Sequence, residues 1–186
     1  MIYIVSGYMR SGTSMMMQAL EAGGMEVACS LGRDARMNAK WGAPDYLPNQ
    51  RYYELEPEDY RDASFPAAYE GRLVKCLWGG ALRLRPVTSY RVVFMRRETQ
   101  AIQQSLTAFF GTPTAETRSA DFQRHLDNAV SILRDRRSVA SLHEVGYSDV
   151  VRNPLQVFDM LAKEGWPINP VSAARIPETK RIRFAA

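Results

Sequence analysis

The chain has 186 residues, of which 46% are hydrophobic and 24% are charged. This composition is typical of a globular protein, and the length fits one domain with a sheet covered on both faces. The net charge of +4 is compatible with an anionic small-molecule ligand, and no nucleic-acid recognition motif accompanies it.

The elements expected along the chain are short apolar strands that alternate with helical patterns, as in a parallel α/β sheet. Strands are predicted at 2–6, 72–77, 90–95 and 138–145. Helices are predicted at 14–22, 98–110 and 114–136, with a further one from Asn153-Pro154 to Gly165. The pattern predicts a three-layer α/β fold: a central, mainly parallel sheet of four to five strands, flanked by helices, in a single domain over 1–186.

The segment 29–70 differs from the rest, because it is rich in Gly, Pro and Tyr and has little periodicity. A segment of this length within a compact domain is typically a lid or substrate-binding region. The alternative is a surface loop with a short helix near 57–61.

A glycine-framed turn follows the first strand, with Gly7 and Gly12 separated by four residues. A turn between a buried strand and a helix start is a cradle for an anion, since backbone N–H groups point into it. We therefore predict a phosphate-binding loop, made by these residues: Gly7, Arg10, Ser11, Gly12, Thr13 and Ser14. A tight turn that merely caps the helix is the alternative.

Thr13 occupies the position at which a Walker loop carries the lysine that contacts ATP phosphates. A nucleoside triphosphatase also needs an acidic residue at a strand end to hold Mg²⁺, and none of the predicted strands after the first ends in an isolated Asp. Both observations argue against ATP with magnesium, and no metal site is expected.

Arg96 and Arg97 follow the third predicted strand, at the edge where open α/β sheets bind ligands. Ser105 lies two turns into the next helix, so Arg97 and Ser105 can converge on one phosphate. The alternative is that the arginines only solvate the strand end.

The two motifs together resemble sulfotransferases that use 3′-phosphoadenosine 5′-phosphosulfate (PAPS). Residues 5–14 are similar to the family's 5′-phosphosulfate loop, and residues 94–105 resemble its 3′-phosphate motif, including the Arg-to-Ser spacing. The chain looks most like short bacterial sulfotransferase-like proteins over about half its length, with matches at 10–24, 49–57, 73–75 and 90–106 and a weaker one at 176–183.

This resemblance implies a P-loop-type fold, PAPS as the cofactor, no metal, and transfer of a sulfuryl group to a hydroxyl or amine. The acceptor would be a small molecule or carbohydrate, and the expected location is cytoplasmic. Two features support that location: Cys29 and Cys76 form no disulfide framework, and the apolar N-terminal run is too short for a signal peptide or membrane span. The oligomeric state is not predicted.

The catalytic residues expected from the resemblance are Arg10, Lys75 and Glu54. Arg10 and Lys75 would stabilise the charge that develops on the leaving phosphate, although Lys75 could instead extend from an edge strand. Glu54 is the predicted general base, because Leu77 stands where better-known sulfotransferases have a catalytic His. We expect Tyr52 and Tyr53 to desolvate this carboxyl and raise its pKa.

Several alternatives remain open around these assignments. Glu54 could instead begin a helix, with Glu56 and then Asp34 as the next candidates for the base. Met9 replaces a Pro that is usual in the family's loop. His125 is expected at a helix edge and His143 on a strand. Arg181 is predicted to close over the 3′-phosphate.

Two other functions are compatible with the same cradle. One is a P-loop nucleotide or small-molecule kinase that uses ATP, and the other is a non-catalytic protein that binds sulfonucleotides.

Overall fold

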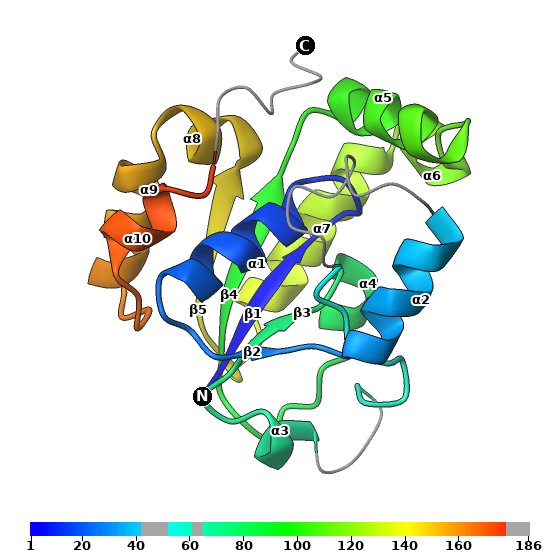
Figure 1. Cartoon of the computed structure of the whole chain (residues 1–186). Coiled ribbons are helices and arrows are strands. Elements are labelled where there is room, and N and C mark those ends of the chain that lie inside the picture. Colours follow the sequence, from blue (N-terminus) through cyan, green and yellow to red (C-terminus); the bar gives the residue numbers. More distant parts are fainter. Residues whose placement is uncertain (42–51, 61–64, 178–186) are drawn as a thin grey trace.

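A computed structural model describes residues 1–41, 52–60 and 65–177 of the chain (Figure 1). Its centre is a five-stranded sheet in the order β2-β3-β1-β4-β5, in which every pairing is parallel. The strands are β1 (Ile2–Gly7), β2 (Val27–Ala28), β3 (Leu73–Lys75), β4 (Tyr90–Arg96) and β5 (Val139–Gly146). The predicted α/β fold with a central parallel sheet is confirmed.

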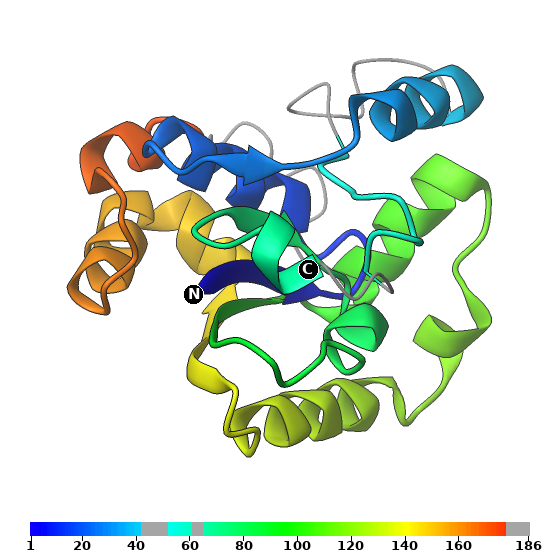
Figure 2. The same cartoon turned by 90° about the horizontal axis from the view of Figure 1, so that it is seen from below.

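Helices cover both faces of this sheet, as Figures 1 and 2 show. Residues alternate along β1, so Ile4 belongs to one hydrophobic cluster and Val5 to the other. One cluster includes side chains of α1 (Thr13–Ala22), α8 (Tyr147–Arg152), α9 (Pro154–Lys163) and α10 (Pro170–Ala174). The other includes side chains of α3 (Phe65–Ala68), α4 (Trp78–Ala81), α5 (Thr99–Phe110) and α7 (Phe122–Arg134).

The prediction of one continuous helix over 114–136 is wrong, because the structure has two helices there. Thr114 caps α6 (Ala115–Arg118), since its side chain accepts the N–H of Thr117. Ser119 then adopts an extended conformation, and α7 begins at Phe122. The predicted apolar stripe of α7 is buried.

The segment 29–70 contains more regular structure than its composition suggests. Helix α2 spans Leu31–Trp41, and the side chain of Ser30 accepts the N–H of Arg33 at its start, as an N-cap does. Residues 57–60 form a turn instead of the short helix considered there. Glu54 forms an isolated parallel bridge with Lys75, which brings this segment alongside the end of β3.

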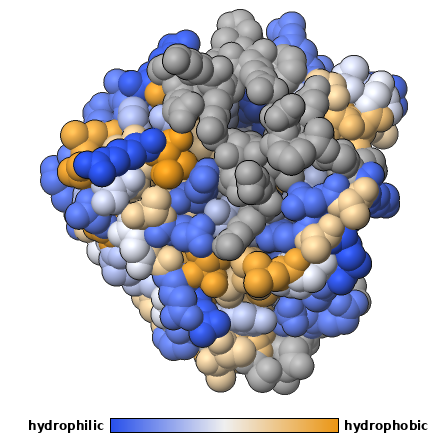
Figure 3. Space-filling model, viewed as in Figure 1, coloured by the Kyte–Doolittle hydropathy of each residue, from blue (hydrophilic) through white to orange (hydrophobic). Residues whose placement is uncertain are grey.

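The surface seen in Figure 3 is largely hydrophilic, with apolar residues in small separate groups. Within the described parts of the chain, no helix is long and apolar enough to cross a membrane. The buried apolar side chains form the two clusters that cover the faces of the sheet.

Candidate functional site

The glycine turn lies between β1 and α1, at the carboxyl edge of the sheet. Gly7 and Gly12 both have positive φ angles, 136° and 99°. A Cβ atom at Gly7 would lie 2.7 Å from the Met95 carbonyl oxygen, and one at Gly12 would lie 2.6 Å from Cδ2 of Tyr147. Both positions therefore need glycine for backbone conformation and for space.

Helix α1 begins directly after this turn. Its first backbone bond runs from the N–H of Met16 to the carbonyl of Gly12. In an α-helix the amides that precede such a bond have no acceptor within the helix, and the helix dipole favours an anion beside them. The start of α1, with Thr13 and Ser14 in its first turn, has the geometry of an anion cradle.

Ser11 shapes the turn through bonds to the turn's own backbone. Its hydroxyl donates to the Tyr8 carbonyl at 2.7 Å, and its own N–H donates to the same oxygen at 3.2 Å. The side chain of Ser11 is also buried. The hydroxyl of Ser11 therefore has a backbone partner within the turn, and its predicted contact with a ligand stays a prediction.

Arg10, Arg97 and Ser105 come together although they are widely separated in sequence. Arg10 Nε donates to Ser105 Oγ at 2.9 Å, and Arg97 Nη1 donates to the Arg10 carbonyl at 2.9 Å. Arg10 itself has a φ of 66°, which is unusual for a residue with a side chain. The strand-end arginine and the helix hydroxyl therefore adjoin the glycine turn.

Two aromatic rings hold these arginines. The guanidinium carbon of Arg97 lies 4.2 Å from the centre of the Tyr147 ring, and that of Arg10 lies 4.9 Å from the centre of the Phe109 ring. Burial lowers the pKa of Arg97, with Tyr147 acting in the opposite direction, but a guanidinium remains protonated. An anionic ligand stabilises a half-buried cation such as this one.

Lys75 points from the end of β3 toward the start of α1. Its Nζ donates to Ser14 Oγ at 3.0 Å and to the Tyr52 carbonyl at 2.7 Å. Strand β3 lies between β2 and β1 and the Lys75 side chain is 5% exposed, so it does not extend from an edge strand into solvent. Burial lowers the pKa of Lys75, while Glu54 acts in the opposite direction.

Glu54 lies beside Lys75, with 3.4 Å between Oε1 and the lysine Nζ. Its other oxygen accepts hydrogen bonds from Nε and Nη2 of Arg33, at 3.2 and 2.8 Å. Burial acts to raise the pKa of Glu54, but Lys75 and Arg33 outweigh it, so the pKa is lower than usual.

The expectation that neighbouring tyrosines raise this pKa is wrong, because two cations contact the carboxylate. The hydroxyl of Tyr53 instead donates to Glu21 on α1, at 2.7 Å. Glu54 also does not begin a helix, since it forms the bridge to Lys75. It is an ionised carboxylate at neutral pH.

The two other candidates for the base have different partners. Asp34 Oδ1 accepts the backbone N–H groups of Tyr52 and Tyr53, at 3.0 and 3.1 Å. Glu56 accepts hydrogen bonds from Ser30 and Arg36, at 2.9 and 2.5 Å. Asp34 thus fixes the backbone that leads to Glu54, and Glu56 pairs with α2.

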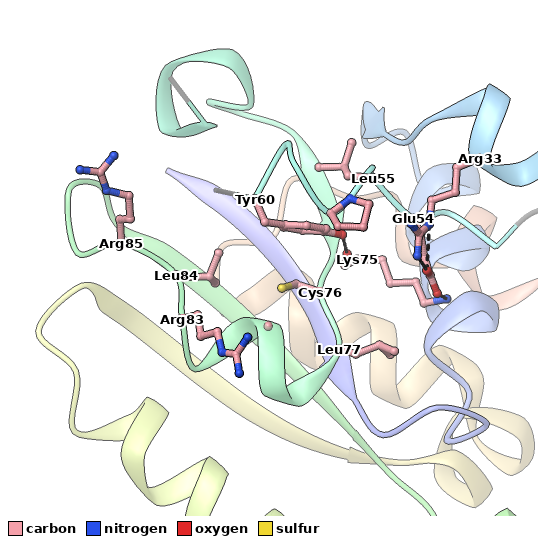
Figure 4. A pocket seen from close by; sticks show the side chains of 12 residues that line it. Arg33, Glu54, Leu55, Tyr60, Lys75, Cys76, Leu77, Arg83, Leu84 and Arg85 are labelled. Carbon is pink, nitrogen blue, oxygen red and sulfur yellow. Dashed lines mark hydrogen bonds and ion pairs between the residues drawn. The ribbon is translucent and has the colours of Figure 1, made fainter. Parts of the chain in front are cut away.

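A pocket of about 500 Å³ lies next to this cluster (Figure 4). Glu54, Lys75 and Arg33 line it, together with apolar side chains such as Leu55 and Leu84. Asp34 and Glu56 do not line it. Of the three acidic candidates, only Glu54 faces both the pocket and the lysine that contacts α1.

The remaining predicted residues lie elsewhere or cannot be placed. His125 is exposed on α7, and His143 on β5 has its Nε2 3.9 Å from a carboxylate oxygen of Glu164. Arg181 lies outside the described residues. In the described ranges, no group of three or more His, Cys, Asp or Glu side chains could hold a metal ion.

Three site residues escaped the sequence reasoning: Arg33, Phe109 and Tyr147. Tyr147 directly follows the last strand, so its place at the carboxyl edge of the sheet was a usable signal. Arg33 and Phe109 carry no such signal, because only the packing of α2 and α5 brings them to the site.

Comparison with known proteins gives little further information. No protein-family model and no curated protein matches the chain. A solved structure whose backbone can be matched to this one is the unliganded crystal structure of a sugar kinase from Janibacter sp. HTCC2649. Its TM-score is 0.39 and its sequence identity is 15%, over 91% of this chain and 96% of that one. A likeness at this level does not establish a shared activity.

Proposed function

We propose that the chain is a PAPS-dependent sulfotransferase that transfers a sulfuryl group to a hydroxyl or amine of a small-molecule or carbohydrate acceptor. The observation that carries this proposal is the contact of Arg97 and Ser105 with Arg10 of the glycine turn. Two adjoining anion-binding motifs suit a nucleotide with two separate anionic groups, as PAPS has at its 5′ and 3′ positions.

In this proposal the glycine turn holds the 5′-phosphosulfate. The amides at the start of α1, the side chains of Thr13 and Ser14, and the Arg10 guanidinium would contact its oxygens. Arg97 and Ser105 would bind the 3′-phosphate. The hydrogen bond from Arg10 to Ser105 would then be exchanged for bonds to the nucleotide.

The chemical step follows from these positions. The acceptor oxygen or nitrogen forms a bond to sulfur, and the bond between sulfur and the 5′-phosphate oxygen breaks, releasing 3′-phosphoadenosine 5′-phosphate (PAP). Glu54 takes the proton of the acceptor, because it is an ionised carboxylate that lines the pocket. Lys75 and Arg10 stabilise the charge that builds on the leaving phosphate.

A small-molecule kinase is the alternative, and the structure reported above is described as a sugar kinase, although its TM-score is too low for it to count as support. In a Walker loop, the hydroxyl at the position of Ser14 binds Mg²⁺. Here the ammonium of Lys75 lies 3.0 Å from that hydroxyl. A fixed cation in contact with Ser14 favours a reaction in which Lys75, and not Mg²⁺, supplies the positive charge at this hydroxyl.

Calorimetric titration of the protein with PAP, and separately with ATP and Mg²⁺, tests the proposal. We expect PAP to bind and ATP with Mg²⁺ to bind far more weakly. Binding of ATP with Mg²⁺ but not of PAP would support the kinase and overturn the proposal. Binding of PAP without PAP release from PAPS, across a panel of hydroxyl and amine acceptors, would support a non-catalytic sulfonucleotide-binding protein.

A further inference from the structure

We infer that Tyr52 contacts the anionic ligand held at the start of α1, and that its hydroxyl donates a hydrogen bond to the sulfuryl group of PAPS. The inference rests on the proposed function, because it takes PAPS as that ligand. It adds a binding residue that lies outside both the glycine turn and the 94–105 motif, and it assigns that residue to the group that is transferred.

The hydroxyl of Tyr52 is buried without a hydrogen-bond partner. The residue is 7% exposed, and no described residue forms a hydrogen bond with its hydroxyl. Its ring belongs to neither of the two hydrophobic clusters that cover the sheet, so filling the core does not explain its burial. A buried polar group that lacks a partner destabilises a protein, and a ligand that accepts its hydrogen bond would give it a role.

The backbone of Tyr52 is fixed beside the glycine turn through both of its polar groups. Its N–H donates to Asp34 Oδ1 at 3.0 Å, and its carbonyl accepts from Lys75 Nζ at 2.7 Å. The same ammonium donates to the hydroxyl of Ser14, in the first turn of α1, at 3.0 Å. One lysine therefore joins Tyr52 to the helix start that we propose holds the 5′-phosphosulfate.

The charged groups near the Tyr52 hydroxyl place it on the side of this turn. Burial raises the pKa of the hydroxyl and Arg10 acts in the opposite direction, while Glu54 and Asp34 add to the rise. Because electrostatic effects weaken with distance, the influence of Arg10 means that the hydroxyl lies near the guanidinium of the turn. The pKa is higher than usual, so the hydroxyl is protonated at neutral pH and is a hydrogen-bond donor.

The neighbours of Tyr52 favour the sulfuryl group as the acceptor of this hydrogen bond. Glu54, two residues further along the chain, is the proposed base and acts where the acceptor atom attacks sulfur. Lys75, which binds the Tyr52 carbonyl, is assigned to the leaving phosphate oxygen on the other side of the sulfur atom. A hydroxyl that lies among Arg10, Lys75 and Glu54 adjoins the group that passes between donor and acceptor, and the charged sulfuryl oxygens are strong acceptors.

Replacing Tyr52 with Phe removes the hydroxyl and keeps the ring. Calorimetric titration with PAPS and with PAP, in the absence of an acceptor, tests the inference, because PAP lacks the sulfuryl group. We expect Tyr52→Phe to bind PAPS about 10- to 100-fold more weakly than the wild type does, and to bind PAP equally well. Its melting temperature should be no lower than that of the wild type, because the deleted hydroxyl has no partner within the described ranges.

Tyr53→Phe is the matched control, because it deletes a neighbouring hydroxyl that does have a partner. The Tyr53 hydroxyl donates to Glu21 on α1 at 2.7 Å, and its ring belongs to the cluster that contains α1 side chains. We expect Tyr53→Phe to lower the melting temperature by about 2–4 °C and to leave the affinities for PAPS and PAP unchanged.

Several results would overturn the inference. They are an undiminished PAPS affinity in Tyr52→Phe, equal losses for PAPS and PAP, and the same loss of PAPS affinity in Tyr53→Phe. A lower melting temperature of Tyr52→Phe would also count against it, since the hydroxyl would then have a partner within the protein. A wild type that binds neither nucleotide contradicts the proposed function itself, whereas a wild type that binds both, without the expected loss in Tyr52→Phe, contradicts this inference alone.

Discussion

The side chains of Lys75 and Glu54 are both largely buried, with 5% and 17% of their surfaces exposed. Removing two charges from water costs free energy, which their mutual attraction and further hydrogen bonds must offset. Lys75 has Ser14 and the Tyr52 carbonyl as additional partners, and Glu54 has Arg33. Both charged groups therefore have hydrogen-bond or ion-pair partners without a ligand. They are held at the start of α1, where the proposed reaction takes place.

Replacing Glu54 with Gln keeps the shape of the side chain and removes its capacity to accept a proton. We expect Glu54→Gln to abolish sulfuryl transfer while PAP binds as tightly as before, because the nucleotide contacts assigned here do not involve Glu54. PAP release from PAPS with a working acceptor measures the first effect, and calorimetry measures the second. Glu56→Gln is the control, since Glu56 is paired with Arg36 and lies outside the pocket. Sulfuryl transfer by Glu54→Gln at the wild-type rate would show that Glu54 is not the base.

The same carboxyl should make the stability of the protein depend on pH. Its folded pKa is below the ordinary value of 4.5, so its stabilising contribution is present above pH 4.5 and is lost as pH falls through the folded pKa. Glu54→Gln should be less stable than wild type by about 1–3 kcal/mol at pH 7. Urea denaturation between pH 7 and pH 3.5 should show this difference shrinking with acid; a difference independent of pH would contradict the assigned ion pairs.

The long strands and helices were predictable because their signals are local. The apolar runs of β1 and β4 and the stripe of α7 agree with the structure to within a few residues. Short elements such as β2, α4 and α10 were missed, since two to five residues carry too little periodicity. Helix α2 was missed although Ser30 and Asp34 are N-terminal helix signals, because the Gly- and Pro-rich composition of 29–70 is typical of a loop and masks them.

Some residues of the candidate site could likewise be predicted from local sequence signals, and others could not. Gly7, Gly12, Arg97 and Ser105 were predictable because strand–turn–helix geometry fixes where they lie. The pairing of Glu54 with Arg33 and Lys75 was not, because it depends on how α2 and the segment 52–55 pack against β3. The direction of the pKa shift at Glu54 followed from that packing and was predicted wrongly.

The turn before α1 should be sensitive to an added methyl group. Gly12→Ala combines a positive φ with a clash against Tyr147, whereas Gly24→Ala has a similar φ of 105° and open space around it. We expect Gly24→Ala to cost about 1–2 kcal/mol from backbone strain and Gly12→Ala to cost about 1–3 kcal/mol more. Thermal or urea denaturation measures both. Equal losses would mean that Tyr147 does not pack against the turn.

Helix α7 offers a test of the sheet-facing stripe. Leu133 is 1% exposed and the adjacent Ile132 is 49% exposed. Leu133→Ala should lower the free energy of unfolding by about 2–5 kcal/mol, whereas Ile132→Ala should change it by less than about 1 kcal/mol. Denaturation midpoints for the two variants provide the comparison. Similar losses would contradict the orientation of α7 on the sheet.

The proposed nucleotide site depends on the topology of the entire sheet. Strands β1 and β4 are parallel neighbours, with Gly7 paired to Met95. The chain therefore leaves both strands at the same edge, so that Arg97 emerges beside the turn and α5 brings Ser105 to it. Segments about 90 residues apart are thus brought into contact, and both contribute to the proposed two-anion site.

The most direct measurement compares PAP with adenosine 5′-monophosphate, which lacks the 3′-phosphate, by calorimetry on wild type, Arg97→Ala and Arg96→Ala. Arg96 is the matched control, because it is paired with Asp127 and Glu144. The proposed two-anion site predicts that wild type and Arg96→Ala bind PAP about 10- to 100-fold more tightly than the monophosphate, and that Arg97→Ala loses this difference. Equal affinity of the wild type for the two nucleotides, or an undiminished preference in Arg97→Ala, would contradict it.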